Sequence, residues 1–291
     1  MVNLKYVSSD NVEFDLKDFK VIKLQAGNFH KVTWTPETIT RQYGTKINRF
    51  TKAPQKFNCV FKLKGNPAGR KTQLDNFIFQ TEQDIAREQP GAIWWNNQYI
   101  NCYFITHDTH PEGSGIAYTV VEGEFYCAYP FWIEEQNVII RPSEQSTEGF
   151  PEDVKGYPES RAFVYGYNPK YSYPYAKTAV SLRVDSALPA NFKAVIYGPT
   201  PAVIFTISGH LYEVDYGLRA GQIMIIDSRD STPASERCIV VNENGTTINV
   251  FDYRNPNSLL FQKVPNGEIV LNYSRTFGID LTLYQERSAP I

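Results

Sequence analysis

Apolar and polar residues alternate most clearly in the first half of the chain. Residues 56–64 place an apolar side chain at every second position, as a strand with one buried face requires. Residues 99–105 and 121–127 show the same period of two. The apolar positions of the three runs are Phe57, Cys59, Phe61 and Leu63, then Ile100, Cys102 and Phe104, then Val121, Phe125 and Cys127. Three half-buried strands are predicted, and Pro130, which cannot continue a ladder, is expected to end the set.

One segment between these strands has the period of a helix. Its apolar residues at helical spacing are Leu74, Phe77, Ile78 and Ile85. Asn66 and Pro67 suit the N-cap and the first helical position, and the helix is expected to end before Pro90-Gly91. Three acids near its C-terminus are poorly placed for the helix dipole, so we expect them to face basic residues of a neighbouring subunit. These acids are Glu82, Asp84 and Glu88.

The second half of the chain has the pattern of an antiparallel β-sandwich. Residues 133–160 lose periodicity and gain Pro, Gly, Ser and acidic residues, which marks a domain boundary. Beyond residue 177, short apolar runs are separated by turn dipeptides such as Ser208-Gly209 and Asn244-Gly245. The expected strands are 179–184, 192–197, 202–208, 210–215, 223–227, 239–242, 247–251, 259–264, 269–273 and 279–284.

The predicted architecture is mainly β and has two domains. Residues 1–135 form an N-terminal domain that resembles a β-barrel or sandwich with one α-helix, residues 136–160 form a linker, and residues 161–291 form the antiparallel β-sandwich. A length of 291 residues supports this division, because it exceeds the usual size of a single hydrophobic core. Within the first domain, Pro36 and Gly44 indicate a long connection before the strand that begins near Lys56.

Charge adds one local feature to this picture. The net charge of -2 and the apolar fraction of 42% are ordinary, and neither half of the chain carries a charge that indicates a nucleic-acid or membrane partner. No acidic residue lies between Glu37 and Asp75, however, and we call this stretch the basic strip. We interpret it as the solvated face of strands in preference to a phosphate-binding or partner surface. Its members are Arg41, Lys46, Arg49, Lys52, Lys56, Lys62, Lys64, Arg70 and Lys71.

The cysteines and the chain ends point to an ordinary globular protein. Cys59, Cys102, Cys127 and Cys238 have no CxxC spacing, and the first three lie on apolar strand faces, so buried and reduced thiols are expected. The first residues contain no apolar run for a signal peptide, and no later segment is apolar enough to span a bilayer. The chain is therefore expected to remain where it is made.

Two candidate binding sites fail on residue spacing. Residues 65–72 follow a strand and open a helix, as a phosphate-binding loop does, but Arg70 stands where a Walker loop needs Gly before its Lys, and Pro67 removes a backbone donor. His107 and His110 with Asp108 could begin a metal site, yet no third and fourth ligands follow at a recognised spacing. Residues 107–113 are instead predicted to be a polar loop tip, and no cofactor or metal is expected.

No catalytic residue is predicted either. Glu122 with Glu124, or Glu134 with Glu135, could supply the carboxylate pair of a glycoside hydrolase, but alternating glutamates are also what a half-solvated strand shows. There is no Gly-x-Ser-x-Gly elbow, and the cysteines have no distinctive catalytic context. The Asn-x-Ser/Thr motifs for N-glycosylation at Asn244 and Asn272 would matter only in a secreted glycoprotein.

The order of these features resembles the distal tail proteins (Dit-like) of long-tailed, siphovirus-type bacteriophages. The likeness rests on a strand, a helix and Pro90-Gly91, followed by two short motifs and an all-β second half. The motifs are Trp95-Asn96 with Tyr99-Ile100-x-Cys102-Tyr103, and Cys127-x-x-Pro130-Phe131-Trp132. Residues 261–269 and 284–287 also resemble the end of that family's second domain, so the likeness covers nearly the whole chain.

The resemblance implies a structural protein of the virion, assembled in the cytoplasm of the host bacterium. In this family the first domain is tail-tube-like and builds a hexameric ring through which DNA passes. The second domain is a galectin-like β-sandwich, or jelly roll, at the periphery. The implied partners are further copies of the chain, the tail-tube protein, the tail-tip hub protein and, in some phages, receptor-binding proteins.

Two alternative functions remain open at the level of sequence. The sandwich could be a carbohydrate-recognition module that touches the host, although the His-x-Asn-x-Arg pattern of galectins is missing around His210 and no tryptophan follows Trp132. Tyrosines between residues 165 and 175 could stack on a sugar, but tyrosine is also ordinary strand material. A weaker alternative is a cell-wall hydrolase that uses Glu122 and Glu124.

Overall fold

The computed structural model describes residues 3–16, 29–64, 66–112, 118–141, 179–186, 188–274 and 276–291. They form two compact units: unit 1 comprises Met1–Glu135 with Tyr284–Ile291, and unit 2 comprises Gln136–Leu283. Both units are built mainly from antiparallel strands, so the predicted mainly β class is confirmed. No helix in the described part of the chain is long and apolar enough to cross a membrane.

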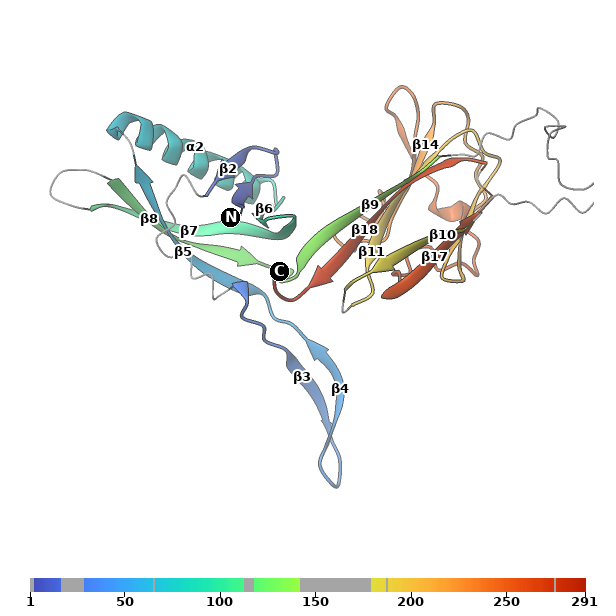
Figure 1. Cartoon of the computed structure of the whole chain (residues 1–291), viewed down its shortest axis with the longest axis horizontal. Helices are drawn as coiled ribbons and strands as arrows, with labels where there is room; N and C mark the ends of the chain where they lie inside the picture. The colour runs from blue at the N-terminus through green and yellow to red at the C-terminus, as the bar shows by residue number, and fades with distance from the viewer. Residues whose placement is uncertain are drawn as a thin grey trace, which may run out of the picture. The chain divides into compact units, whose positions relative to one another are not determined.

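In its described residues, unit 1 is an antiparallel β structure with one long helix (Figure 1). Its strands are β1 (Leu4–Val7), β2 (Glu13–Asp15), β3 (Thr35–Thr40), β4 (Thr45–Thr51), β5 (Gln55–Lys64), β6 (Gly91–Trp95), β7 (Gln98–Glu112), β8 (Tyr118–Cys127) and the start of β9 (Trp132–Ile140). The order β2-β1-β6-β7 forms one set of neighbours, and β7 also pairs with β8, which pairs with β5. The helix is α2 (Pro67–Ala86).

The predicted strand faces of unit 1 are confirmed. The side chains that close its core are Phe57, Cys59, Leu63, Ile100, Cys102, Phe104, Val121, Phe125 and Cys127, each at most 4% exposed. Phe61, expected on the same face, lies outside the residues whose side chains are described. All four cysteines are free and buried as expected. Burial raises the pKa of the Cys59 thiol and that of Cys238, which is raised to about 12, so these thiols are poor nucleophiles.

Helix α2 begins and ends where the sequence predicts. The Asn66 side chain accepts a hydrogen bond from the Gly69 amide at 2.6 Å, Pro67 is the first helical residue, and Arg87 caps the C-terminus. The expected outward-facing role of Asp84 is wrong. Its carboxylate is buried, and it accepts hydrogen bonds from the Tyr6 hydroxyl at 2.5 Å and the Ser9 hydroxyl at 2.6 Å. A strand and a loop of the same unit therefore satisfy this acid.

Unit 2 is a sandwich of two antiparallel sheets (Figure 1). One contains β16 (Thr247–Asn249), β15 (Cys238–Val241), β14 (Ile223–Asp227), β11 (Asn191–Tyr197), β18 (Gly278–Arg287) and β9, in that order. The other contains β10 (Ala179–Val184), β17 (Gly267–Tyr273), β12 (Val203–Ile207) and β13 (His210–Val214). Apolar side chains from both sheets form a single buried cluster that includes Phe192, Phe205 and Leu281.

One expected strand of unit 2 is absent from the described residues. Residues 259–264 contain one turn, at Leu260 and Phe261, and only Val264 makes an isolated bridge, to Ala190. Side chains take the backbone carbonyls that a strand would need: a ring nitrogen of His210 lies 3.0 Å from the Leu259 oxygen, and the Tyr212 hydroxyl donates to the Gln262 oxygen at 2.9 Å. The segment still buries apolar side chains, which is why its sequence resembles a strand.

The unit boundaries differ from the expected domains at two places. Gln136–Ile140, assigned to a linker, continue strand β9, because exposed residues there alternate with partly buried ones and Ile140 is buried. Tyr284–Ile291, assigned to the second domain, belong to unit 1. Tyr284 packs there with Tyr99 and Ile133. The remainder of the expected linker and the tyrosines of residues 165–175 lie outside the described residues.

Candidate interaction surface

A hairpin of β3 and β4 is the most exposed element of unit 1. Among the described strands it pairs with no other, and it extends away from the sheets of the unit (Figure 1). Ile39, Ile47 and Phe50 are exposed by 53%, 50% and 56%. A two-stranded ribbon is at best marginally stable in water, and exposed apolar side chains on such a ribbon are typical of a binding surface. We therefore take this hairpin as the candidate interaction surface.

A β-bulge sorts the side chains of the hairpin onto two different faces. Glu37 pairs with Arg49 and Thr38 with Ile47, so β4 contains one extra residue at this point. Paired residues share a face, and neighbours along β3 alternate between faces. The charged face consists of Glu37, Ile39, Lys46 and Arg49, and the uncharged face consists of Pro36, Thr38, Ile47 and Phe50. The hairpin is therefore amphipathic although its sequence shows no alternation.

The long connection predicted for this region is wrong. Ile47 and Phe50 are three positions apart, and without the bulge a strand would place them on opposite faces. The chain reverses between Arg41, whose amide donates to the Gly44 carbonyl at 2.9 Å, and Gly44, whose φ of +84° favours glycine. The turn dipeptide Tyr43-Gly44 between two threonine-rich runs was the one available sequence signal.

The base of the hairpin is fixed to the rest of unit 1 through Lys52. Its ammonium group donates to the backbone oxygen of Pro130 and lies 3.4 Å from that of Ser288. It also lies 4.5 Å from the centre of the Phe131 ring, whose neighbour at 5.9 Å is Trp34. Burial lowers the pKa of Lys52 to about 8. These contacts hold the point at which the hairpin leaves the unit.

The basic strip does not form one continuous solvated face. Arg49 forms an ion pair with Glu37 at 2.6 Å, and Lys56 forms one with Glu124 at 2.8 Å. Arg70 is buried, at 3% exposure. The strip therefore divides among the hairpin, strand β5 and helix α2, and the hairpin holds the bases Arg41, Lys46 and Arg49.

The histidines considered for a metal site lie in a strand. Residues 107–112, predicted as a loop tip, continue β7 and pair with β8, where His107 is opposite Gly123. The pairing of β7 with β8 shifts register after Phe104. Beyond this point both faces of β7 are polar, so the alternation of apolar and polar residues that identifies a strand is missing. The His107 ring stacks on Phe104 at 6.1 Å. The part of the chain that is described holds no group of three or more His, Cys, Asp or Glu residues that could bind a metal ion.

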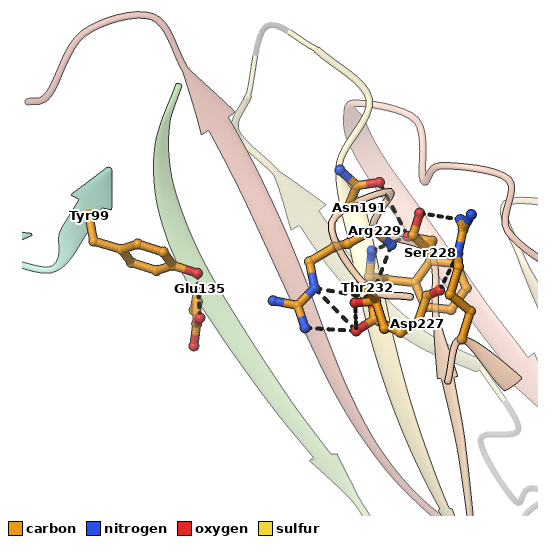
Figure 2. Close-up of polar contacts among 9 residues, drawn as sticks. Tyr99, Glu135, Asn191, Asp227, Ser228, Arg229 and Thr232 are labelled. Carbon is orange, nitrogen blue, oxygen red and sulfur yellow. Dashed lines mark hydrogen bonds and ion pairs between the residues drawn. The ribbon is translucent and has the colours of Figure 1, made fainter. Parts of the chain in front are cut away.

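Three of the four candidate carboxylates are held by hydrogen bonds or an ion pair within unit 1. Glu124 binds Lys56, as described above. Glu134 accepts hydrogen bonds from the side-chain amides of Asn97 and Gln98 at 2.7 and 3.0 Å. Glu135 accepts one from the Tyr99 hydroxyl at 2.9 Å (Figure 2). These contacts join β9 to the β6–β7 turn and β7, which is a structural use of the carboxylates.

The residues of the rejected phosphate loop also have structural roles. Asn66 caps helix α2 and Arg70 is buried, while Gly65 lies outside the described residues. In unit 2, the imidazole of His210 packs on Tyr212 at 4.7 Å and faces a backbone oxygen. Asn66 and His210 are therefore used in contacts within their own units.

Unit 2 contains a buried carboxylate that organises the segment after β14 (Figure 2). Asp227 is 3% exposed, and its oxygens accept from the Arg229 guanidinium at 2.7 Å and the Thr232 hydroxyl at 2.9 Å. Arg237 donates to the backbone oxygens of Asp227 and Ser228 at 3.2 and 2.8 Å. The network closes the loop between β14 and β15.

The Asp227→Asn variant is expected to lose about 1 to 3 kcal/mol of unfolding free energy at pH 7. Burial alone would raise the pKa of Asp227, but Arg229 and Thr232 outweigh burial and hold it below its ordinary value. A carboxyl with a depressed folded pKa stabilises the protein above its unfolded pKa of about 3.9, and this contribution is lost as the pH falls through the folded pKa. The wild type should therefore lose more stability between pH 5 and pH 3 than the variant does.

Urea unfolding followed by circular dichroism at the two pH values measures this difference. Asp230→Asn is the matched control, because Asp230 approaches Arg237 at 3.4 Å but its side chain is 85% exposed, so it should change stability little at either pH. An equal loss of unfolding free energy in the Asp227→Asn and Asp230→Asn variants would contradict the role assigned to Asp227.

A shallow groove of about 540 Å³ lies on unit 2. Its lining includes the polar side chains of Thr200, Thr206, Asn272 and Thr276. Ile204, which is 46% exposed, also lines it. Neutral donors and acceptors beside an apolar wall could accept a neutral polar ligand.

Comparison with known proteins finds similarity only at the level of structure. No protein-family model and no curated protein matches the sequence. Among solved structures, the Dit protein (gp 19.1) of SPP1, described as a paradigm of the hub adsorption apparatus in phages that infect Gram-positive bacteria, matches with a TM-score of 0.59 and 12% identity. The match covers 99% of this chain and 99% of that chain.

Two chains from the baseplate of phage P2 in its activated conformation also match. The structure with calcium has a TM-score of 0.62 and that with strontium 0.60, each at 11% identity over 100% of both chains. These likenesses cover both units, including the helix-bearing first unit and the sandwich. The chain therefore has the fold of the Dit-like distal tail proteins of bacteriophages.

Proposed function

We propose that this chain is a structural protein of a phage tail tip, located in the virion and assembled in the host cytoplasm. The observation that carries the proposal is the match over 99% or more of both chains to a phage hub protein and to baseplate chains. In this proposal six copies form a ring that joins the tail tube to the tail-tip hub, lets DNA pass through its lumen and anchors receptor-binding proteins.

The hairpin of β3 and β4 supports the proposal of a ring, because its exposed apolar side chains are suited to a contact with another copy. Ile47 and Phe50 lie on its uncharged face, and each is at least half exposed. A contact that buries them between adjacent copies removes this apolar area from water. We propose that this face is one of the contacts between copies.

Purified protein is expected to form rings or ring-sized oligomers. Negative-stain images with mass measurement in solution test this, and added tail-tube protein should promote or extend the rings. A strict monomer at high concentration that gives no ring with the tube protein would contradict the proposed function.

The proposed role is structural and not enzymatic. This is supported by the way Glu124, Glu134 and Glu135 are held by Lys56, amides and Tyr99 within unit 1. We expect no lysis of bacterial cell walls by the wild type. Lysis that disappears in the Glu122→Gln, Glu124→Gln double variant would overturn this assignment in favour of a glycoside hydrolase.

Carbohydrate binding by unit 2 is the second candidate function, and the groove lined by Thr200, Thr206 and Asn272 favours it. A galectin-like sandwich that recognises host glycans would give the tail tip a direct role in adsorption. A glycan array with the full chain tests this candidate. Binding that Asn272→Ala and Thr206→Val weaken would support it, and no binding would leave the structural role alone.

A further inference from the structure

We propose that the charged face of the β3–β4 hairpin docks on the exposed stripe of helix α2 in a second copy of the chain. The inference rests on the proposed ring, and it names the two surfaces that join neighbouring copies. It follows from the charges and spacing of both surfaces, which are described next.

The outer side of helix α2 carries an acid, an aromatic ring and a second acid in line. Asp75, Phe79 and Glu82 are exposed and lie at positions i, i+4 and i+7, which share one helix face. Phe79 is 56% exposed. Among the described residues neither acid forms an ion pair. The opposite side of the helix, with Phe77 and Asp84, is the one that unit 1 buries.

The charged face of the hairpin carries two bases and an apolar side chain that can meet these groups. Ile39 pairs with Lys46, and Arg49 follows on the same face beyond the bulge, so an apolar side chain lies beside two bases. Lys46 forms no ion pair with any described residue. Arg49 uses its Nε to bind Glu37, and a guanidinium has further N–H donors for a second carboxylate.

The spacing of the charges allows both acids to be reached by one hairpin. Asp75 and Glu82 are separated by seven helical residues, or about 10 Å at a rise of ~1.5 Å per residue. Lys46 and Arg49 lie opposite Ile39 and Glu37, which are two residues apart on β3, so the bulge leaves the two bases only about 7 Å apart along the strand. The long lysine and arginine side chains can cover the remaining few ångströms, so two ion pairs can form at once while Ile39, which lies opposite Lys46, meets Phe79.

The contact joins two different surfaces, because the hairpin and the helix are separate parts of unit 1. Such a head-to-tail contact is not self-complementary, so it repeats from copy to copy and closes into a ring when the rotation fits. The uncharged face of the hairpin stays available for the contact proposed above. Both faces of the exposed ribbon are then covered in the assembly.

Charge reversal in the full chain tests the pairing. The variants K46E/R49E and D75K/E82K should each raise the concentration needed for half-maximal assembly by at least about tenfold, because like charges then meet across the contact. The four-fold variant that carries both reversals should recover most of this loss, whichever acid meets which base. E268K, a reversal of an exposed acid in unit 2, should leave assembly unchanged.

Cysteine cross-linking tests the proposed neighbours directly. The native cysteines are all buried, so they give little background. A chain with Ile39→Cys mixed with a chain with Phe79→Cys should form a cross-linked dimer on mild oxidation, and one chain with both changes should form a ladder of oligomers. Ile39→Cys with Leu259→Cys, where Leu259 is 66% exposed on unit 2, is the control that should not cross-link.

The outcomes separate this inference from the proposed function. Weakened assembly, recovery in the combined variant and the specific cross-link together support the docking. Wild-type rings that are insensitive to both reversals and give no cross-link would overturn the docking and leave the ring intact. A wild type that forms no ring under any condition would overturn the proposed function and the docking with it.

Discussion

Replacing Ile47 and Phe50 together with serine is expected to abolish ring assembly while unit 1 stays folded. Both side chains lie on the uncharged face of the hairpin, where they contribute nothing to the core of their own unit. Burying them in a subunit contact is worth about 3 kcal/mol or more, and its loss at each contact weakens association at least ~100-fold. Every contact of a closed ring loses this binding free energy, so the losses add up around the ring.

Solution mass measurement and negative-stain images read out the assembly, and fluorescence reads out the fold. All four tryptophans of the chain, Trp34, Trp94, Trp95 and Trp132, lie in unit 1, so an unchanged emission spectrum reports that this unit is intact. Ile204→Ser with Leu259→Ser is the matched control, because it removes similar exposed apolar area from unit 2. Normal rings from the hairpin variant would exclude the uncharged face from the ring contacts.

The Gly91→Ala variant is expected to destabilise unit 1 by about 3 kcal/mol. A methyl group at this first residue of β6 would lie 2.2 Å from the Tyr6 hydroxyl oxygen and 2.9 Å from a carboxylate oxygen of Asp84. Real contacts of this kind do not occur, so the tyrosine must move away. The movement breaks the buried hydrogen bond between Tyr6 and Asp84, which ties β1 to helix α2.

Urea unfolding followed by tryptophan fluorescence measures this loss in unit 1. Tyr6→Leu provides the control background, because it removes the ring and hydroxyl that the new methyl would meet while it keeps an apolar side chain. The cost of Gly91→Ala should shrink in that background, as expected for residues in direct contact. An equal cost in both backgrounds would show that the strain does not involve Tyr6.

The sequence by itself predicts the elements whose burial is one-sided and regular. Strand β5, with Phe57, Cys59 and Leu63 inward, and helix α2, with its Asn66 cap, were predicted from periodicity and capping alone. The strands of unit 2 followed from apolar runs between turns. The resemblance to distal tail proteins, carried by residues 90–132 and the chain end, indicated the fold that the comparison of structures shows.

Only the tertiary structure decided the candidate surface and the partners of the polar groups. The bulge in β4 moves Ile47 and Phe50 onto one face, and a one-residue insertion of this kind erases the period of two on which sequence reasoning depends. Asp84 was expected to face outward, and Tyr6, 78 positions away in the chain, holds it inside the unit. Residues 259–264 resemble a strand, and distant side chains take their carbonyls. In the last two cases the deciding contact joins residues about 50 or more positions apart, which a local sequence pattern cannot show.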